Sequence, residues 1–323
     1  MRIGKLTNEQ LREIVLQKLP PAEDLLLKPT VGEDCAAIRF GDTACVISTD
    51  PITGATENAG ALAVHVSAND VASSGAQPRW MLATMLVPPD KTAKDVEAVG
   101  DELIETAREM GIGIIGGHTE VTDAVSRIVI STTVIGRTEI RNLISSGGAR
   151  EGDALIMTKT AGLEGTYIIA SERKNALAGV LSADEFNEAK ALSDQISVAL
   201  EGVIAAKAGA TAMHDVTEGG VFGAVHELCE ASGIGCEVDV QSIPVLEMTR
   251  KIAAHFGIDP YRLIGSGSML IAAKDADGML AALKEAGIQA AKIAVMGGTR
   301  VMMRDAEGLR EIAPPRADEL FSI

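Results

Sequence analysis

The fold of this chain is decided by residues 34–50, which read DCAAIRFGDTACVISTD. Two apolar runs rich in strand-forming residues flank Gly41-Asp42, a dipeptide that favours a two-residue hairpin turn. A turn centred there lets the two runs pair as antiparallel strands. In that register Asp34 and Asp50 lie side by side at the same end of the ribbon.

Asp34 and Asp50 are candidate metal ligands. Two carboxylates this close repel each other unless a cation or a proton lies between them. Carboxylate oxygens suit Mg²⁺, which usually takes one or two of them together with the phosphates of a substrate. The alternative is that both aspartates lie in loops exposed to water.

Asp70 is a third candidate ligand, because it is the only Asp, Glu, Lys or Arg between Ala61 and Pro78. The stretch 61–74 is rich in Ala, Val and Ser and has no clean polar face, which predicts a helix packed on most sides. A buried carboxylate without a partner is costly, and a metal ion is a natural partner. The alternative is an aspartate on the polar surface of the helix.

Length, net charge and cysteine spacing exclude several classes of protein. A chain of 323 residues is longer than one typical domain, so we expect two. The formal net charge is −16, without a basic run, which argues against nucleic-acid or membrane-surface binding. The four cysteines form no CxxC, so we expect no structural zinc. No apolar run spans a membrane, and we expect a cytoplasmic protein.

Helices and strands are predicted to alternate along the chain, as in layered α/β domains. In the first half we expect helices over 8–19 and 92–110, strands over 80–87, 112–115 and 128–135, and a turn at Gly116-Gly117-His118. In the second half we expect strands over 154–157, 212–214, 236–240, 269–273 and 292–296, a loop over 158–165, and helices over 182–208, 221–231, 247–256 and 276–286. The polar, glycine-rich segment 137–153 predicts a boundary between domains at 1–145 and 150–323.

Two further motifs carry possible chemistry. Residues 215–220, DVTEGG, lie between a predicted strand and a predicted helix, where glycines allow a close approach and the helix start favours an anion. An ordinary turn explains them equally well, and no P-loop spacing occurs. His118 is a candidate metal ligand, phosphate contact or general acid/base, with a solvated turn histidine as the alternative.

Five motifs in a fixed order resemble the aminoimidazole ribonucleotide (AIR) synthase superfamily. They are GEDCAA at 32–37, STD at 48–50, NDVASSGAQP at 69–78, GGHT at 116–119 and DVTEGGV at 215–221. The resemblance implies an α/β (α+β), two-domain PurM-like fold. It implies an N-terminal sheet that pairs into a barrel across a homodimer, a layered C-terminal α/β domain, and a cleft for ATP and Mg²⁺.

The resemblance also implies roles for individual residues. Asp34, Asp50 and Asp70 would bind the metal, and Asp50 and His118 are the candidate catalytic residues. The remaining cleft residues would contact metal, phosphate or nucleotide, with the GGHT segment at the cleft within the chain or across the dimer. They are Ser48, Thr49, Gly117, Thr119, Asp215, Thr217, Gly219 and Gly220.

Within the superfamily, the second-domain motif resembles the hydrogenase maturation protein HypE. HypE ends in a reactive cysteine, whereas the last cysteine here is Cys236, so we expect a HypE-like protein without it. The resemblance implies a Mg-ATP-dependent enzyme that activates an amide or carbonyl oxygen of a small-molecule or thiocarboxamide-type substrate. The alternatives are a small-molecule kinase similar to thiamine-monophosphate kinase and a non-catalytic nucleotide-binding paralogue.

Overall fold

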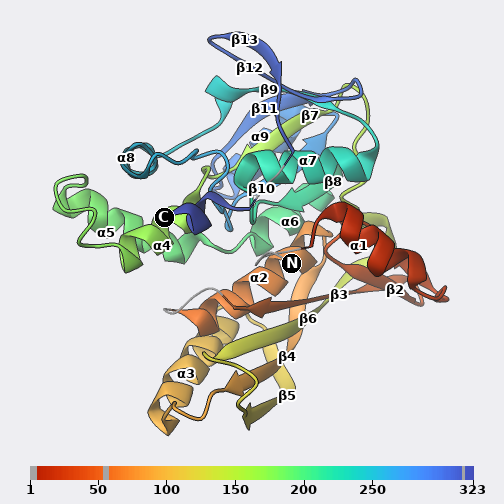
Figure 1. The fold of residues 1–323 in the computed structure, drawn as a ribbon. Helices are drawn as coiled ribbons and strands as arrows, with labels where there is room; N and C mark the ends of the chain where they lie inside the picture. The colour runs from red at the N-terminus through yellow and green to blue at the C-terminus, as the bar shows by residue number, and fades with distance from the viewer. Residues whose placement is uncertain (1–5, 54–57, 315–316) are drawn as a thin grey trace.

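The computed structural model describes residues 6–53, 58–314 and 317–323, and it contains two separate sheets (Figure 1). The first sheet has the order β1-β2-β3-β6-β4-β5. Its strands are β1 (Leu25–Leu27), β2 (Ala36–Phe40), β3 (Thr43–Ile52), β4 (Gln77–Val87), β5 (Gly113–Val121) and β6 (Val129–Glu139). The predicted hairpin is confirmed, because β2 and β3 are antiparallel with Phe40 opposite Thr43.

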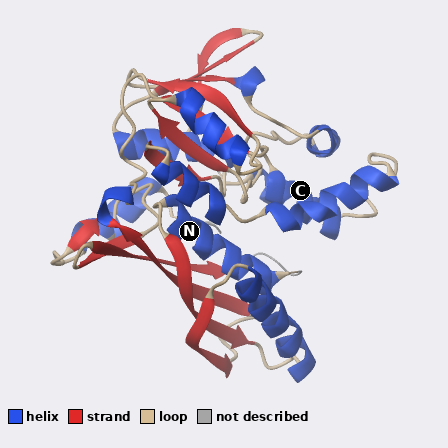
Figure 2. Cartoon of the chain, turned by 180° about the vertical axis from the view of Figure 1, so that it is seen from behind, coloured by secondary structure: helices blue, strands red, loops and turns tan. Residues whose placement is uncertain are grey.

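Helices cover one face of the first sheet. Helix α2 (Ala59–Ser73) packs on β3 and β6, and α3 (Ala93–Glu109) packs beside it (Figure 2). Side chains of β4 alternate between the two faces: Met81 is fully buried under the helices, whereas Trp80 and Leu82 are about two-fifths exposed on the other face. The single chain therefore leaves an apolar sheet face uncovered.

The second sheet has the order β13-β12-β9-β11-β7-β10-β8. Its strands are β7 (Ala154–Thr158), β8 (Ala210–Asp215), β9 (Cys236–Asp239), β10 (Met269–Ala273), β11 (Ala290–Met296), β12 (Val301–Asp305) and β13 (Gly308–Glu311). One core lies under α7 (Gly220–Ser232), and the other lies under α6 (Ala199–Lys207) and α9 (Ala276–Glu285).

The helices α4 (Leu163–Glu172), α5 (Ala183–Ala191) and α8 (Glu247–Phe256) form a smaller cluster beside the second sheet (Figure 1). A short helix, α1 (Asn8–Ile14), begins at the capping box of Thr7. No helix in the described ranges is long and apolar enough to cross a membrane.

The predicted long helix over 182–208 is wrong. Helix α5 ends at Ala191, a 3-10 turn follows, and α6 begins at Ala199. Asn69 of α2 explains the break, because its Nδ2 donates to Ile196 O and its Oδ1 accepts from Val198 N, each at 2.8 Å. The side chain of the first half thus satisfies backbone groups that would otherwise continue the helix.

The predicted turn at Gly116-Gly117-His118 is also wrong. These residues lie within β5, which runs parallel to β4. A Cβ on Gly117 would lie 2.0 Å from Ala83 O, so glycine is needed here for the close approach of two strands rather than for a turn. One helix and three strands were not predicted at all: α4, whose first residues lie in the expected loop 158–165, and β1, β12 and β13.

Candidate active site

A cavity of about 320 Å³ lies where the two halves of the chain meet. Residues from the hairpin and α2 line one side, and residues from α4, the segment before α7, and the segment 318–323 line the other. The polar and charged side chains around it are Asp34, Asp50, Thr53, Asp70, Glu164, Glu172, Arg173, Thr217, Glu218 and Ser266.

The structure brings the three predicted metal ligands together. Asp34 and Asp50 come from the ends of the hairpin strands, and Asp70 is buried on α2. Ser48 Oγ donates a hydrogen bond to Asp70 Oδ2 at 2.6 Å, which fixes that carboxyl group. Burial, followed by the carboxylates of Asp215, Asp34 and Asp50, raises the pKa of Asp70 well above its usual range. Four carboxyl groups therefore crowd one site.

Asp215 joins the cluster from the end of β8. It is 1% exposed, and neither carboxylate oxygen accepts a hydrogen bond from any residue that the structure describes. A buried anion in this state is strongly disfavoured unless a cation completes it. Asp215 is thus the observation within the cluster that points most directly to a bound metal.

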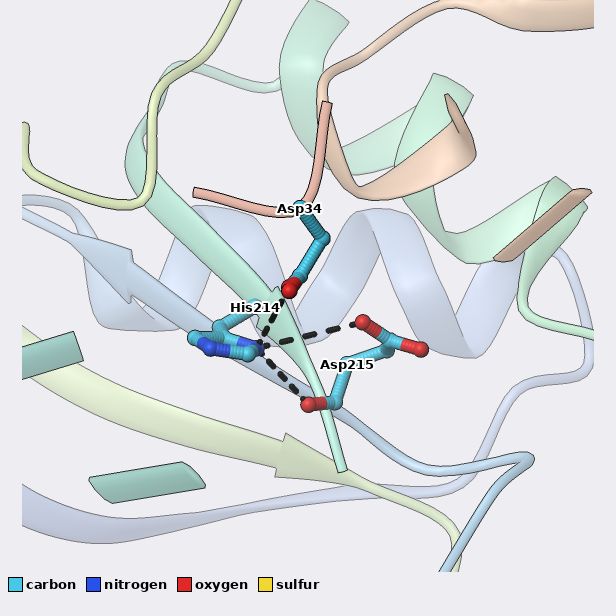
Figure 3. Close-up of side chains that lie close together, drawn as sticks. All are labelled: Asp34, His214 and Asp215. Atoms are coloured by element: carbon cyan, nitrogen blue, oxygen red, sulfur yellow. Dashed lines mark hydrogen bonds and ion pairs between the residues drawn. The ribbon is translucent and has the colours of Figure 1, made fainter. Parts of the chain in front are cut away.

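His214 lies among these carboxylates, as Figure 3 shows. Its Nδ1 is 2.9 Å from Asp215 O, 3.7 Å from Asp34 Oδ2 and 3.8 Å from Asp215 Oδ1. Burial opposes protonation, but the carboxylates of Asp34, Asp215 and Glu227 together raise the pKa of His214 well above its usual range. Sequence reasoning had no partner for His214 beyond its neighbour Asp215.

The donor set fits a divalent cation. Asp34, His214 and Asp215 each offer one ligand atom within 4.8 Å of the others. Among the described residues that line the cavity, Arg173 is the only Lys or Arg, and the basic side chain that lies against the aspartates is that of His214. Carboxylate oxygens of this number and kind match the preferences of Mg²⁺, with phosphate oxygens supplying the remaining ligands.

The glycine motif lies beside the aspartates, and Thr217 lines the cavity. Gly219 and Gly220 have φ of 82° and 61°, and α7 begins at Gly220. A Cβ on Gly220 would lie 2.6 Å from Tyr261 O, so a side chain has no room. The backbone N–H of Gly219 donates to the buried Asp318 Oδ2 at 2.7 Å, which is the type of anion contact that a helix start favours.

Thr49 lies on the other face of β3 from Ser48 and Asp50, because side chains alternate along a strand. Its Oγ1 donates to Thr132 O at 3.0 Å and accepts from Thr133 Oγ1 at 3.0 Å. The structure of one chain therefore does not bring Thr49 to the cavity, and its predicted ligand contact stays a prediction.

The GGHT segment is also apart from the aspartates within one chain. Gly117, His118 and Thr119 lie on the edge strand β5, three strands from β3, or roughly 14 Å at the usual strand spacing. The side chain of His118 is 63% exposed, and its Nε2 is 3.0 Å from Glu120 Oε2. A role for this segment at the cleft of a partner chain stays a prediction.

Sequence reasoning missed Glu164 in the cavity. Glu164 is 5% exposed, and its Oε2 accepts no hydrogen bond from any described residue. Burial raises the pKa of Glu164 to about 7, although hydrogen bonds from Ser266 oppose the shift. No signal marked this position, because α4 begins after Gly162 without a side-chain cap.

Comparison with known proteins adds to this geometry. Residues 32–138 match the N-terminal domain of AIR synthase related protein, and residues 150–303 match its C-terminal domain. A putative hydrogenase expression/formation protein of Methanocaldococcus jannaschii is 30% identical over 296 residues, covering 87% of this chain and 84% of that protein.

Carbamoyl dehydratase HypE of Cupriavidus necator is 30% identical over 263 residues, covering 78% of this chain and 73% of that protein. A solved structure of the hydrogenase maturation protein HypE in complex with ATP has the same fold, with a TM-score of 0.70 at 23% identity. The match covers 98% of this chain and 97% of that chain.

Proposed function

Because the chain belongs to the AIR synthase-related protein family, with HypE-like relatives, we propose that it is a Mg-ATP-dependent enzyme that phosphorylates a substrate oxygen of amide or carbonyl type. The observation that carries the proposal is the cluster of four aspartates, in which neither oxygen of the buried Asp215 accepts a hydrogen bond from the described residues. ATP is the nucleotide named for the HypE structure of the same fold.

Each part of the cavity has a role in this proposal. Asp34, Asp50, Asp70 and Asp215 would hold Mg²⁺, which when bound neutralises phosphate charge and aligns the γ-phosphoryl group. Ser48 keeps the Asp70 carboxyl in place. The segment before α7, where Thr217 lines the cavity, would contact phosphate oxygens at the helix start, while the N–H of Gly219 already donates to Asp318 Oδ2.

We also propose that two copies pair through the uncovered face and edge of the first sheet. Trp80 and Leu82 are exposed on that face, and Ile115 of the edge strand β5 is 57% exposed. Pairing there would bury this apolar surface and would allow His118 to reach the cleft of the partner. The domain of residues 1–145 would then provide metal binding and dimerisation, and the domain of residues 150–323 would provide the nucleotide loop.

A thermal-shift titration with ATP, with and without Mg²⁺, tests the proposal. A ligand at about 100 times its Kd adds about 2.7 kcal/mol to the stability of the folded state. We expect a Mg²⁺-dependent shift that Asp50→Asn removes and that Asp42→Asn, at the exposed hairpin turn, retains. The absence of any shift in the unmodified protein at saturating ATP would contradict the proposal.

Turnover then separates the reaction types. A dehydration or ring closure driven by ATP releases free phosphate, whereas a kinase similar to thiamine-monophosphate kinase leaves a stable phosphorylated product. We expect free phosphate. ATP binding without hydrolysis in any substrate mixture would identify a non-catalytic paralogue instead.

A further inference from the structure

Glu164 is a buried acid without a cationic partner. It faces the cavity from the first turn of α4, and its Oε2 has no hydrogen-bond donor in the described part of the chain. Ser266 donates to the carboxyl group, and the other groups that act on it, Asp318 and Glu218, are themselves acidic. Among the described residues, none donates to the second oxygen of Glu164, and the charged groups named above as acting on it are negative.

The charged residues of the cavity outside the metal cluster also favour a positively charged ligand. With Asp34, Asp50 and Asp70 assigned to Mg²⁺, the acidic residues that remain are Glu164, Glu172 and Glu218. Arg173 offsets one of these three charges, and its Nη2 donates to Ile323 O at 3.0 Å. This part of the cavity is net negative, so it favours a positively charged ligand.

The same part of the cavity also has an apolar lining. The 3-10 turn of residues 319–322 lies against the helices of the small cluster, close to α4 in Figure 1. It presents Leu320 and Phe321 to the cavity, and α4 adds Ile168 and Ile169. The whole cavity, which this part shares with the metal cluster, has a volume of about 320 Å³.

We propose that this part of the cavity binds the acceptor substrate and that the acceptor carries an ammonium or amidinium group beside an apolar body. The N–H of that group donates to Glu164 Oε2, and the apolar body lies against Phe321 and its neighbours. This assignment rests on the proposed function, because it places the acceptor next to the metal cluster that would hold the phosphoryl donor.

Three probes of the same planar shape test the assignment: benzamidine, benzamide and benzoate. Calorimetric titration at about pH 8, where a carboxyl group with a pKa of about 7 is ionised, gives the Kd of each. We expect benzamidine to bind at least about tenfold more tightly than benzoate, with benzamide between them, because a charge-assisted hydrogen bond is stronger than a neutral one. Equal binding of benzamidine and benzamide would overturn the assignment of a cationic group.

Variants locate the site. Glu164→Gln removes the charge at nearly constant shape and is expected to weaken benzamidine binding about tenfold. Glu188→Gln, the same change at an exposed position of α5, is expected to leave it unchanged. If Glu164→Gln does not fold, Glu164→Asp keeps the charge and should still prefer benzamidine to benzoate. Unchanged benzamidine binding in Glu164→Gln would overturn the proposal.

The Mg-ATP thermal shift of the same variant distinguishes the two proposals. We expect Glu164→Gln to keep the shift, and a loss of it would assign Glu164 to the nucleotide site instead. If the unmodified protein shows no Mg-ATP shift but still prefers benzamidine, the proposed function fails while the cation site stands.

Discussion

Two buried carboxylates of the second domain differ in what surrounds them. Glu201 of α6 is 3% exposed, and its Oε1 lies 2.8 Å from Lys159 Nζ. Asp215 is buried as deeply, but neither of its oxygens has a donor among the described residues. The chain therefore gives Glu201 a close ammonium partner, whereas Asp215 has, among the described residues, only the more distant imidazole of His214, with Nδ1 at 3.8 Å from Oδ1, and is the proposed metal ligand.

Lys159 explains why the first of these sites is structural. Its Nζ also donates to the backbone oxygens of Gln195, Ser197 and Gly267, at 3.0, 2.6 and 2.8 Å. The Lys159–Glu201 pair thereby connects the end of β7 with the segment between α5 and α6. Asp215 instead faces Asp34, Asp70 and His214, a set that gains from a cation rather than from further packing.

The largest effect is expected for Lys159→Met, which leaves Glu201 buried and unpaired. Removing one partner of a buried ion pair typically costs about 3–5 kcal/mol of unfolding free energy. Urea denaturation measures the loss, with Lys190→Met at an exposed position of α5 as the control. A loss below about 1 kcal/mol would mean that water replaces the ammonium group, as at surface pairs, and Glu201 and Asp215 would then not differ in kind.

The second prediction concerns Glu164, which like Asp215 has a buried oxygen without a hydrogen bond from the described residues. Its pKa is raised from 4.5 to about 7 by burial, so the folded protein binds the proton more tightly than the unfolded chain. The group therefore favours folding fully below about pH 4.5, and this contribution of about 3 kcal/mol is lost as the pH rises through about 7.

The contribution of Glu164 is the difference in unfolding free energy between the unmodified protein and Glu164→Gln, because the other titratable groups are the same in both proteins. We expect the difference to fall by about 3 kcal/mol between about pH 4.5 and about pH 8. Glu188→Gln, on exposed surface, should give a difference that does not change with pH. A flat profile for Glu164→Gln would show that water hydrates the carboxylate.

The sequence predicts the aspartates of the proposed metal site better than the surroundings of Asp215 and Glu164, because local patterns place the former. Asp34 and Asp50 are placed by a two-residue turn a few positions away, and Asp70 by the apolar composition of its own helix. The surroundings of Asp215 depend on how the halves meet, which no local pattern contains. The break between α5 and α6 likewise depends on Asn69, more than 100 residues away in sequence.

Glu164 could not be predicted for a related reason. Its helix begins after Gly162 at a φ of 64° and has no capping side chain, so the usual start signals are absent. The environment of its carboxyl group is set by Ser266 and Asp318, which lie on other segments of the chain. A glutamate in a predicted loop, by contrast, is expected to be exposed.

The smallest expected change in unfolding free energy has opposite signs for the Asp215 site and the Glu201 site. Asp215→Asn and Glu201→Gln make the same chemical change at equally buried positions. In a chelator, Asp215→Asn is expected to raise the unfolding free energy by about 1 kcal/mol, because it removes a buried charge without a donor, whereas Glu201→Gln is expected to lower it by at least that amount.

With Mg²⁺ and ATP present, we expect the unmodified protein to be more stable than Asp215→Asn, the reverse of the order in the chelator. The unmodified protein then gains the binding energy of the ligands, which Asp215→Asn cannot recover, and chemical denaturation with and without the ligands measures both terms. A lower stability of Asp215→Asn in the chelator would mean that the pairing of Asp215 with His214 already compensates its charge. The four aspartates would then be a finished network like that of Lys159 and Glu201, and the grounds for a metal ion at Asp215 would disappear.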